Sequence, residues 1–252
     1  MPEWAKGEMI AGASYPDMDW PYFSMDHSYN PYTKKGMRLV FQFPDLMSLM
    51  EKEVKQLFHE LENTVERADI PKILKRLGRM YHFMSDLAVP AHVHNIPHMF
   101  IDLPRIGKCD FEEYLGLDQQ LIALNNIEIG DISSIEVNSF DDFWLHVKNV
   151  SKFTFLASSF TYEELQDIAR ERLISDTLNK KTLIKDLSKK GVSIVPVEGL
   201  HNEDRYYVRH LTSHQCYEIS QKATFYSLKS LSSCFLFLVS ETMERLEKYK
   251  LV

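Results

Sequence analysis

Three side chains that can bind a metal ion lie close together in the stretch from Gly78 to Asn95. His82 and Asp86 are four residues apart, so on a helix they project from the same side, one turn from each other. His92 follows just past Pro90, which stops a helix because the residue before a proline is driven out of the right-handed helical region. Imidazole nitrogens and carboxylate oxygens are the ligands that Zn²⁺ takes where thiolates are absent. The spacing therefore indicates a candidate zinc site, and the simpler interpretation is a helix-surface His–Asp pair followed by a loop histidine.

Two further candidate ligands lie upstream, in a segment that is poorly suited to form a helix. Residues 14–33 contain three prolines and many Asp, Ser, Asn and aromatic residues, a composition typical of an ordered loop. Asp17 and His27 lie in this loop. With His82 and Asp86 they would supply two carboxylates and two imidazoles, a set suited to a hydrolytic zinc ion. Each has an alternative role, because Asp17 could cap a turn and His27 could pack among aromatic side chains in the core.

The elements that must position these residues are predicted to be helices. Apolar residues recur at helical period in two segments, which predicts helices near 45–67 and 71–89. His82 and Asp86 lie off the apolar stripe of the second helix, so they are either solvated or directed into a cleft, and Gly78 leaves room one turn before His82. Further helices are expected at 4–13, 110–125, 140–160, 161–175 and 206–248, with 192–197 strand-like and, as an alternative, a break in the last helix near His214. Together these elements predict an all-α fold, a single-domain helical bundle over residues 1–252.

Length, charge and cysteine content limit the class of protein. A chain of 252 residues is near the upper limit for one hydrophobic core. Its net charge of −7 argues against nonspecific nucleic-acid binding, which depends on Lys and Arg neutralising phosphates. The three cysteines share no C-x-x-C spacing, which argues against a disulfide framework. The most apolar stretch, 234–239, is too short to span a bilayer, and the first residues lack the regions of a signal peptide. The compartment is therefore left open between the cytosol and secretion after removal of a leader.

The motif that runs from His82 to Asn95 resembles the central motif of the bacterial zinc-dependent phospholipase C family. The shared positions are His82, Asp86, Pro90, His92 and Asn95. Upstream, residues 15–19 and 26–27 are similar to the segments that carry the family's Asp and His zinc ligands, and downstream, residues 111–114 resemble the segment that ends its last ligand pair. The order agrees over most of the chain. The single-strand nucleases with the same trinuclear arrangement are the nearest relatives of that family.

The resemblance implies both a fold and a set of ligands. It implies an all-α domain with up to three zinc ions at the base of a cleft, hydrolysing phosphodiester bonds of phospholipids, with contact at a membrane surface. The implied metal ligands are Asp17, His27, His82, Asp86, His92 and Glu112. Asp17 would also be the catalytic residue, because a ligating carboxylate with one free oxygen can orient the attacking water.

Two departures from the family change the expected number of zinc ions. The family's N-terminal zinc-binding Trp and the His that follows it have no counterpart before His27. Lys108 stands where the family has the His that pairs with the position of Glu112, and a protonated lysine cannot ligate. His98 and Asp102, which have the same spacing, are an alternative source of ligands. We therefore predict one well-occupied zinc at Asp17, His27, His82 and Asp86, with the position at His92 weakly occupied or empty.

Three functions remain open at this stage. The first is a phosphodiester hydrolase of phospholipase C type with weak activity. The second is a nuclease or nucleotide phosphatase on the same metal site, which would be favoured by a basic, aromatic-lined groove that this acidic sequence does not display. The third, favoured by Lys108, is a catalytically impaired, metal-stabilised binding module.

Overall fold

Helices dominate the computed structural model, which describes residues 3–14, 27–36, 45–63, 66–95, 135–174, 179–197, 204–209 and 213–248. Helix accounts for 72% of this part of the chain, which confirms the mostly helical character expected from the sequence. The helices are α1 (Glu3–Ser14), α2 (Leu46–Asn63), α3 (Ile70–Asp86), α4 (Pro90–Val93), α7 (Phe140–Ala157), α8 (Tyr162–Glu171), α9 (Lys180–Lys189) and α10 (Ser213–Lys248), with a 3₁₀ turn at Arg67–Asp69. Two strands, β1 (Ser193–Pro196) and β2 (Tyr206–Arg209), pair in antiparallel orientation.

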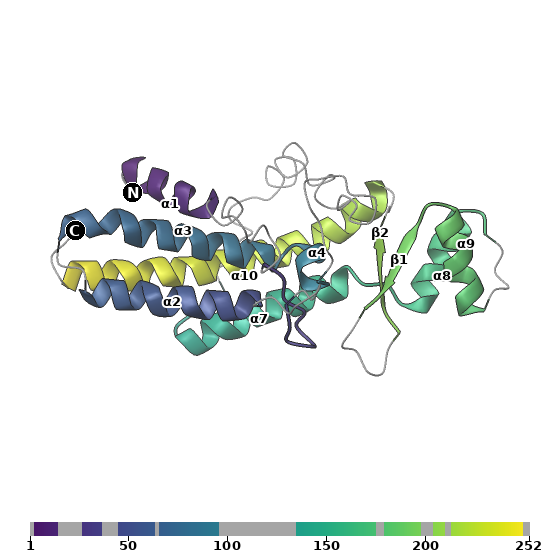
Figure 1. The fold of residues 1–252 in the computed structure, drawn as a ribbon, viewed down its shortest axis with the longest axis horizontal. Coiled ribbons are helices and arrows are strands. Elements are labelled where there is room, and N and C mark those ends of the chain that lie inside the picture. The colour runs from purple at the N-terminus through teal and green to yellow at the C-terminus, as the bar shows by residue number, and fades with distance from the viewer. Residues whose placement is uncertain are drawn as a thin grey trace.

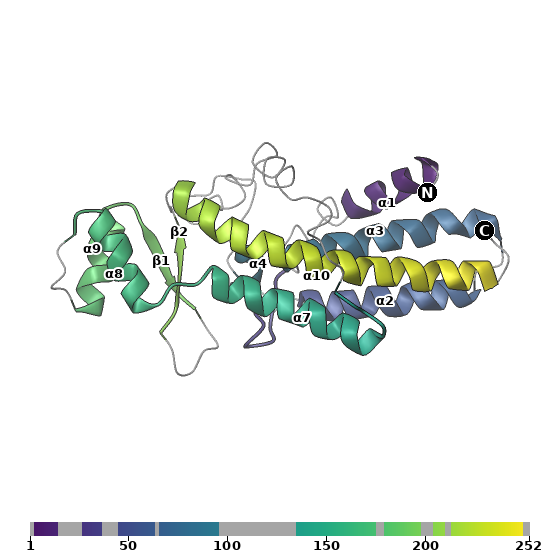
Figure 2. The same ribbon diagram turned by 180° about the vertical axis from the view of Figure 1, so that it is seen from behind.

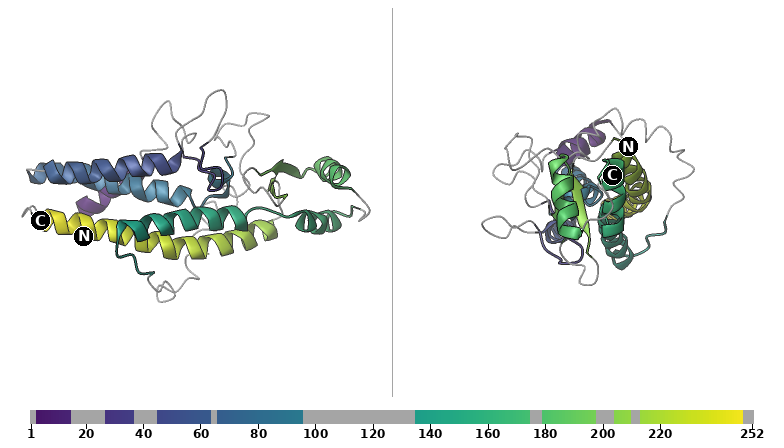
Figure 3. Two further views of the ribbon diagram at one scale, coloured as in Figure 1. Left: turned by 90° about the horizontal axis from the view of Figure 1, so that it is seen from below. Right: turned by 90° about the vertical axis from the view of Figure 1, so that its right-hand side faces the viewer.

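The main core lies between four long helices that run along the same axis (Figures 1 and 2). Figure 3 shows α2 and α3 in one layer and α7 and α10 in the other, with α1 against the outer side of α3. Each helix contributes the apolar stripe that its periodicity predicts. Buried members of the cluster include Leu57, Leu61, Leu77, Met80, Phe143, Val147, Cys234 and Leu238. This apolar packing fixes α3, and with it the backbone that carries the candidate ligands.

Two of the helices end earlier than the sequence suggested. α2 ends at Asn63, whose side-chain amide donates to the backbone carbonyl of His59 at 2.6 Å and so satisfies a carbonyl of the last turn. α3 ends at Asp86 rather than near 89. Val89 is extended (φ −93°, ψ 120°), as a residue before proline prefers to be, and Pro90 occupies the first turn of α4. The short turn between the two helices places α4 beside the end of α3.

A smaller apolar cluster lies at one end of the bundle, between α8, α9 and the two strands (Figure 1). Its buried members include Leu165, Ile168, Leu183, Leu187, Tyr206 and Val208. The prediction of a helix from residue 206 is wrong at its start, because 206–209 form β2. Alternate residues of this strand face different neighbours: Tyr206 and Val208 join the smaller cluster, whereas Tyr207 packs with Ala91 of α4. The single-domain organisation expected from the sequence remains a prediction.

The close contact between α1 and α3 depends on two glycines. A Cβ atom on Gly78 would lie 2.0 Å from the carbonyl oxygen of Met9, and one on Gly12 would lie 2.0 Å from that of Lys75. Both distances are far below van der Waals contact with rigid backbone, so any side chain there forces the helices apart. The room that Gly78 leaves is therefore occupied by α1.

Gly78→Ala is expected to displace α1 and to lower the free energy of unfolding by about 1–3 kcal/mol. Gly7→Ala is the matched control, because Gly7 is an exposed glycine of α1 and a Cβ there meets nothing within 4 Å. That control should be neutral or stabilising by up to about 1 kcal/mol through helix propensity. Urea denaturation followed by circular dichroism measures both, and equal stability of the two variants would contradict the packing described.

Candidate metal centre

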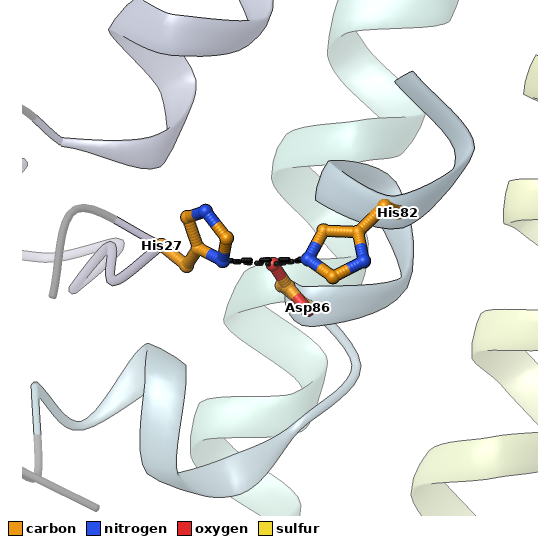
Figure 4. A group of neighbouring side chains, drawn as sticks. All are labelled: His27, His82 and Asp86. Carbon is orange, nitrogen blue, oxygen red and sulfur yellow. Dashed lines mark hydrogen bonds and ion pairs between the residues drawn. The ribbon is translucent and has the colours of Figure 1, made fainter. Parts of the chain in front are cut away.

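Four side chains from three separate segments meet at the end of α3. His82 and Asp86 lie on its last turns, His92 lies on α4, and His27 comes from the 27–36 segment. Figure 4 shows His27 and His82 facing each other across the carboxylate of Asp86. Because His27 is separated from Asp86 by most of two helices in the sequence, only the tertiary fold brings these groups together.

The 27–36 segment is fixed by backbone hydrogen bonds to the elements on either side of it. The N–H of Tyr29 donates to the carbonyl of His92 at 3.0 Å, and the N–H of Leu46 donates to the carbonyl of Ser28 at 3.1 Å. The side-chain amide of Asn95 donates to the carbonyl of Lys35 at 3.1 Å. These bonds tie the segment to α4 and to the first residue of α2, and they hold the backbone of His27 against α3.

Three potential ligand atoms form a triangle with equal sides. Nδ1 of His27 and Nε2 of His82 each lie 3.3 Å from Oδ2 of Asp86, and the two nitrogens lie 3.3 Å from each other. Ligand atoms bound to a tetrahedral zinc ion at 2.0–2.2 Å are separated from one another by about 3.3–3.6 Å. An imidazolium–carboxylate hydrogen bond is shorter, at about 2.7–2.9 Å. The triangle therefore has the dimensions of one face of a metal tetrahedron, and the donor set fits a divalent metal ion.

His92 approaches the other oxygen of the same carboxylate. Its Nε2 lies 3.9 Å from Oδ1 of Asp86, whereas His27 and His82 are grouped around Oδ2. A carboxylate whose two oxygens face different imidazoles can bridge two metal positions. His92 thus lies beside the site without belonging to the triangle.

The carboxylate of Asp86 is shielded from water, so its ionisation depends on the groups around it. The side chains of His27, Asp86 and His92 are 4%, 10% and 6% exposed. Burial alone would raise the pKa of Asp86, but the charge of His92 and the imidazoles of His27 and His82 beside Oδ2 outweigh it and hold that pKa well below its usual range. The carboxylate is therefore ionised at neutral pH, and a buried anion of this kind requires cationic or hydrogen-bonding partners.

His94 is buried elsewhere and takes no part in the cluster. Its ring stacks between Phe155 at 4.4 Å and Tyr207 at 4.9 Å, and its Nε2 lies 2.9 Å from the hydroxyl of Ser158. Burial lowers the pKa of His94 to about 3, so the ring is neutral. His94 is therefore a buried packing residue that joins the end of α4 to α7 and β2.

The remaining predicted site residues lie outside the described part of the chain. These are Asp17, His98, Asp102, Lys108 and Glu112. His27 lies in the group that could hold a metal ion, and its ring also meets that of Phe83 edge-on at 5.2 Å, as the alternative of packing among aromatic side chains expects. The sequence analysis missed the residues that anchor the 27–36 segment, namely Ser28, Tyr29 and Asn95. Only Asn95 carried an indication in the sequence, as one of the shared positions of the motif from His82 to Asn95, and its φ of 54° is a conformation that Asn adopts more readily than most residues.

No protein-family model matches the chain, and the comparison with curated proteins finds no match either. None of the helices in the described ranges is long and apolar enough to cross a membrane. What the chain offers toward function is the buried His–Asp centre together with the sequence motif around it.

Proposed function

We propose that this protein is a zinc-dependent hydrolase of phosphodiester bonds that acts on phospholipids in the manner of a phospholipase C. The observation that carries the proposal is the triangle of His27, His82 and Asp86, with sides of 3.3 Å. Three protein ligands and an open fourth position are usual for a catalytic zinc site. The motif from His82 to Asn95 resembles that of the phospholipase C family, and this resemblance is the reason for proposing phosphodiester hydrolysis as the reaction.

The residues of the centre have separate roles in this proposal. Asp86 supplies the negative charge and would ligate the metal through Oδ2, beside Nδ1 of His27 and Nε2 of His82. Asp17 is proposed as a further ligand that orients the attacking water. A zinc ion bound here would lower the pKa of a coordinated water toward neutrality and neutralise charge on the phosphate oxygens. In hydrolysis, water adds to phosphorus, the bond to the glycerol oxygen breaks, and the proton passes to that leaving oxygen.

A metal-stabilised binding module with little activity is the second candidate, and Lys108 favours it. A cation at the position of a family ligand would repel a metal ion and could pair with Glu112 instead. Loss of one electrostatic contact at a catalytic centre typically costs about 10²–10³ in rate. We therefore expect slow turnover even if the chain is a hydrolase.

Metal analysis and phosphodiester assays on the same preparation test the proposal. Protein purified without chelator should contain about one zinc per chain and should hydrolyse phosphatidylcholine in a chelator-sensitive reaction, about 10²–10³ times more slowly than a three-zinc enzyme. Zinc without hydrolysis would favour the binding module, and faster cleavage of single-stranded DNA would favour a nuclease. A chain that retains no metal would overturn the proposal, and three zinc ions per chain would contradict a single well-occupied site.

A further inference from the structure

A cavity of about 390 Å³ lies between the 27–36 segment, the start of α2 and the middle of α7. Its wall includes none of His27, His82, Asp86 and His92, so it is distinct from the metal centre. A volume of this size accommodates a small polar molecule. The two sites share the 27–36 segment, because Tyr29 and Lys34 line the cavity while His27 faces the metal centre.

Three exposed lysines on two elements line this cavity. Lys34 comes from the 27–36 segment, and Lys148 and Lys152 lie one turn apart on the same face of α7. Within the part of the chain that the structure describes, none of the three forms an ion pair, although other lysines such as Lys72 do. Three lysines at one cavity are notable in a protein whose net charge is −7, although Asp45 and Glu51 also line it.

The backbone holds Lys34 in an unusual conformation. Its φ is 56°, in the left-handed region that a residue with a Cβ occupies at some cost. The turn that imposes this conformation is built on Asn30, whose side-chain oxygen accepts from the N–H groups of Tyr32 at 2.9 Å and Thr33 at 3.1 Å. The N–H of Lys34 itself donates to the carbonyl of Asn30 at 2.8 Å. The turn therefore presents the Lys34 side chain from a fixed backbone.

Hydroxyl groups and two carboxylates complete the wall. Burial, with the negative charges of Asp45 and Glu51, raises the pKa of Tyr29, so its hydroxyl remains protonated and available as a donor. Asp45 is already engaged at the start of α2, where it accepts from the N–H of Ser48 at 3.0 Å and from its hydroxyl at 2.7 Å. The lining therefore carries three positive side chains, Lys34, Lys148 and Lys152, against two negative ones, and its formal charge is positive by one unit.

We propose that this cavity binds a phosphate group, as the free ion, as a soluble phosphate monoester or as a phospholipid head group. The three ammonium groups supply charge-assisted donors to the phosphate oxygens, and the Tyr29 hydroxyl supplies a neutral donor. The carboxylate of Glu51 repels the phosphate and so limits the affinity of the site for it. This site does not depend on the hydrolase activity proposed for the metal centre.

Titration of the full-length chain with inorganic phosphate by calorimetry tests the site directly. The chain is first stripped with a chelator, so that phosphate held by a metal is not counted. Lys148→Ala and Lys152→Ala should each weaken phosphate binding by about tenfold or more. Lys181→Ala is the matched control, because Lys181 is an exposed helical lysine of α9 outside the cavity, and it should leave the affinity unchanged.

Glu51→Gln provides a test of opposite sign. Removal of the carboxylate should tighten phosphate binding several-fold, whereas a cavity for cations would lose affinity with the same change. Binding to phosphatidylcholine vesicles that contain phosphatidic acid, compared with glycerol phosphate in solution, distinguishes a lipid from a soluble source. Lysine-dependent binding of either probe supports the site. Absence of binding to phosphate, glycerol phosphate and vesicles alike would overturn it, as would affinities that the lysine variants and Glu51→Gln leave unchanged.

Discussion

Asp86→Asn is expected to abolish metal retention while leaving the helices folded. Asp86 is the group on which His27, His82 and His92 converge, and the amide preserves its volume but removes its charge. Loss of a ligating carboxylate should weaken zinc binding by more than about a hundredfold, beyond what even a supporting residue contributes. Elemental analysis of protein purified without chelator gives the zinc content per chain. Helicity should persist because α3 is held by its apolar face, and circular dichroism checks this.

Asp141→Asn is the matched control for this change. Asp141 is an exposed carboxylate in the first turn of α7, so the same substitution removes a charge without touching the cluster. The control should retain zinc at the level of the unmodified chain. If Asp86→Asn also retained it, the metal would have to be held elsewhere, and the proposed role of the triangle would be lost.

Arg76→Met is expected to cause the largest loss of stability, about 3–5 kcal/mol. The guanidinium of Arg76 joins α3 to α2 through a bidentate pair with Glu60 at 2.8 and 2.7 Å. It also donates to Glu53 at 2.5 Å and to Gln56 at 2.8 Å, and its side chain is only 14% exposed. Methionine fills the space but removes this partner from the largely buried carboxylates of Glu53 and Glu60. Their pairs with Arg79 and Lys72 remain. Thermal and urea unfolding measure the change in the free energy of unfolding.

Arg170→Met on α8 is the control, because Arg170 makes an exposed pair with Asp167 and its loss should cost less than about 1 kcal/mol. Comparable destabilisation by both variants would contradict the importance of the buried network.

The same network predicts how stability depends on pH. Burial alone would raise the pKa of Glu60, but hydrogen bonds from Arg76 and Lys72 outweigh it and lower the pKa below 4.5. Since the folded pKa lies below the unfolded one, the contribution is fully present above about pH 4.5 and is lost as the pH falls through the folded pKa. Unfolding measured from pH 6 to 3 should show this loss in the unmodified chain and a shallower slope in Arg76→Met.

The sequence by itself determined the helical elements that form the frame of the site. The stripes of α2 and α3 are visible as a period in apolar residues, and the four-residue spacing of His82 and Asp86 places both on one side of α3. These features are local, because each residue of a helix is related to its neighbours by a fixed rotation. Pro90 likewise predicted that the helix is interrupted, because a proline restricts the backbone of the single residue before it. In the structure α3 ends a few residues earlier, at Asp86.

Only the tertiary structure decided which residues meet across the chain. The helical expectation for 206–209 failed because strand formation depends on a partner, here 193–196, that lies elsewhere in the sequence. The segment that carries His27 is held by backbone hydrogen bonds from Tyr29 to His92 and from Leu46 to Ser28, which no side-chain pattern encodes. Lys34 and Lys148 come to one cavity although they are far apart along the chain. Contacts of this kind depend on how complete helices pack, and helix packing is set by the shape of surfaces rather than by the order of residues.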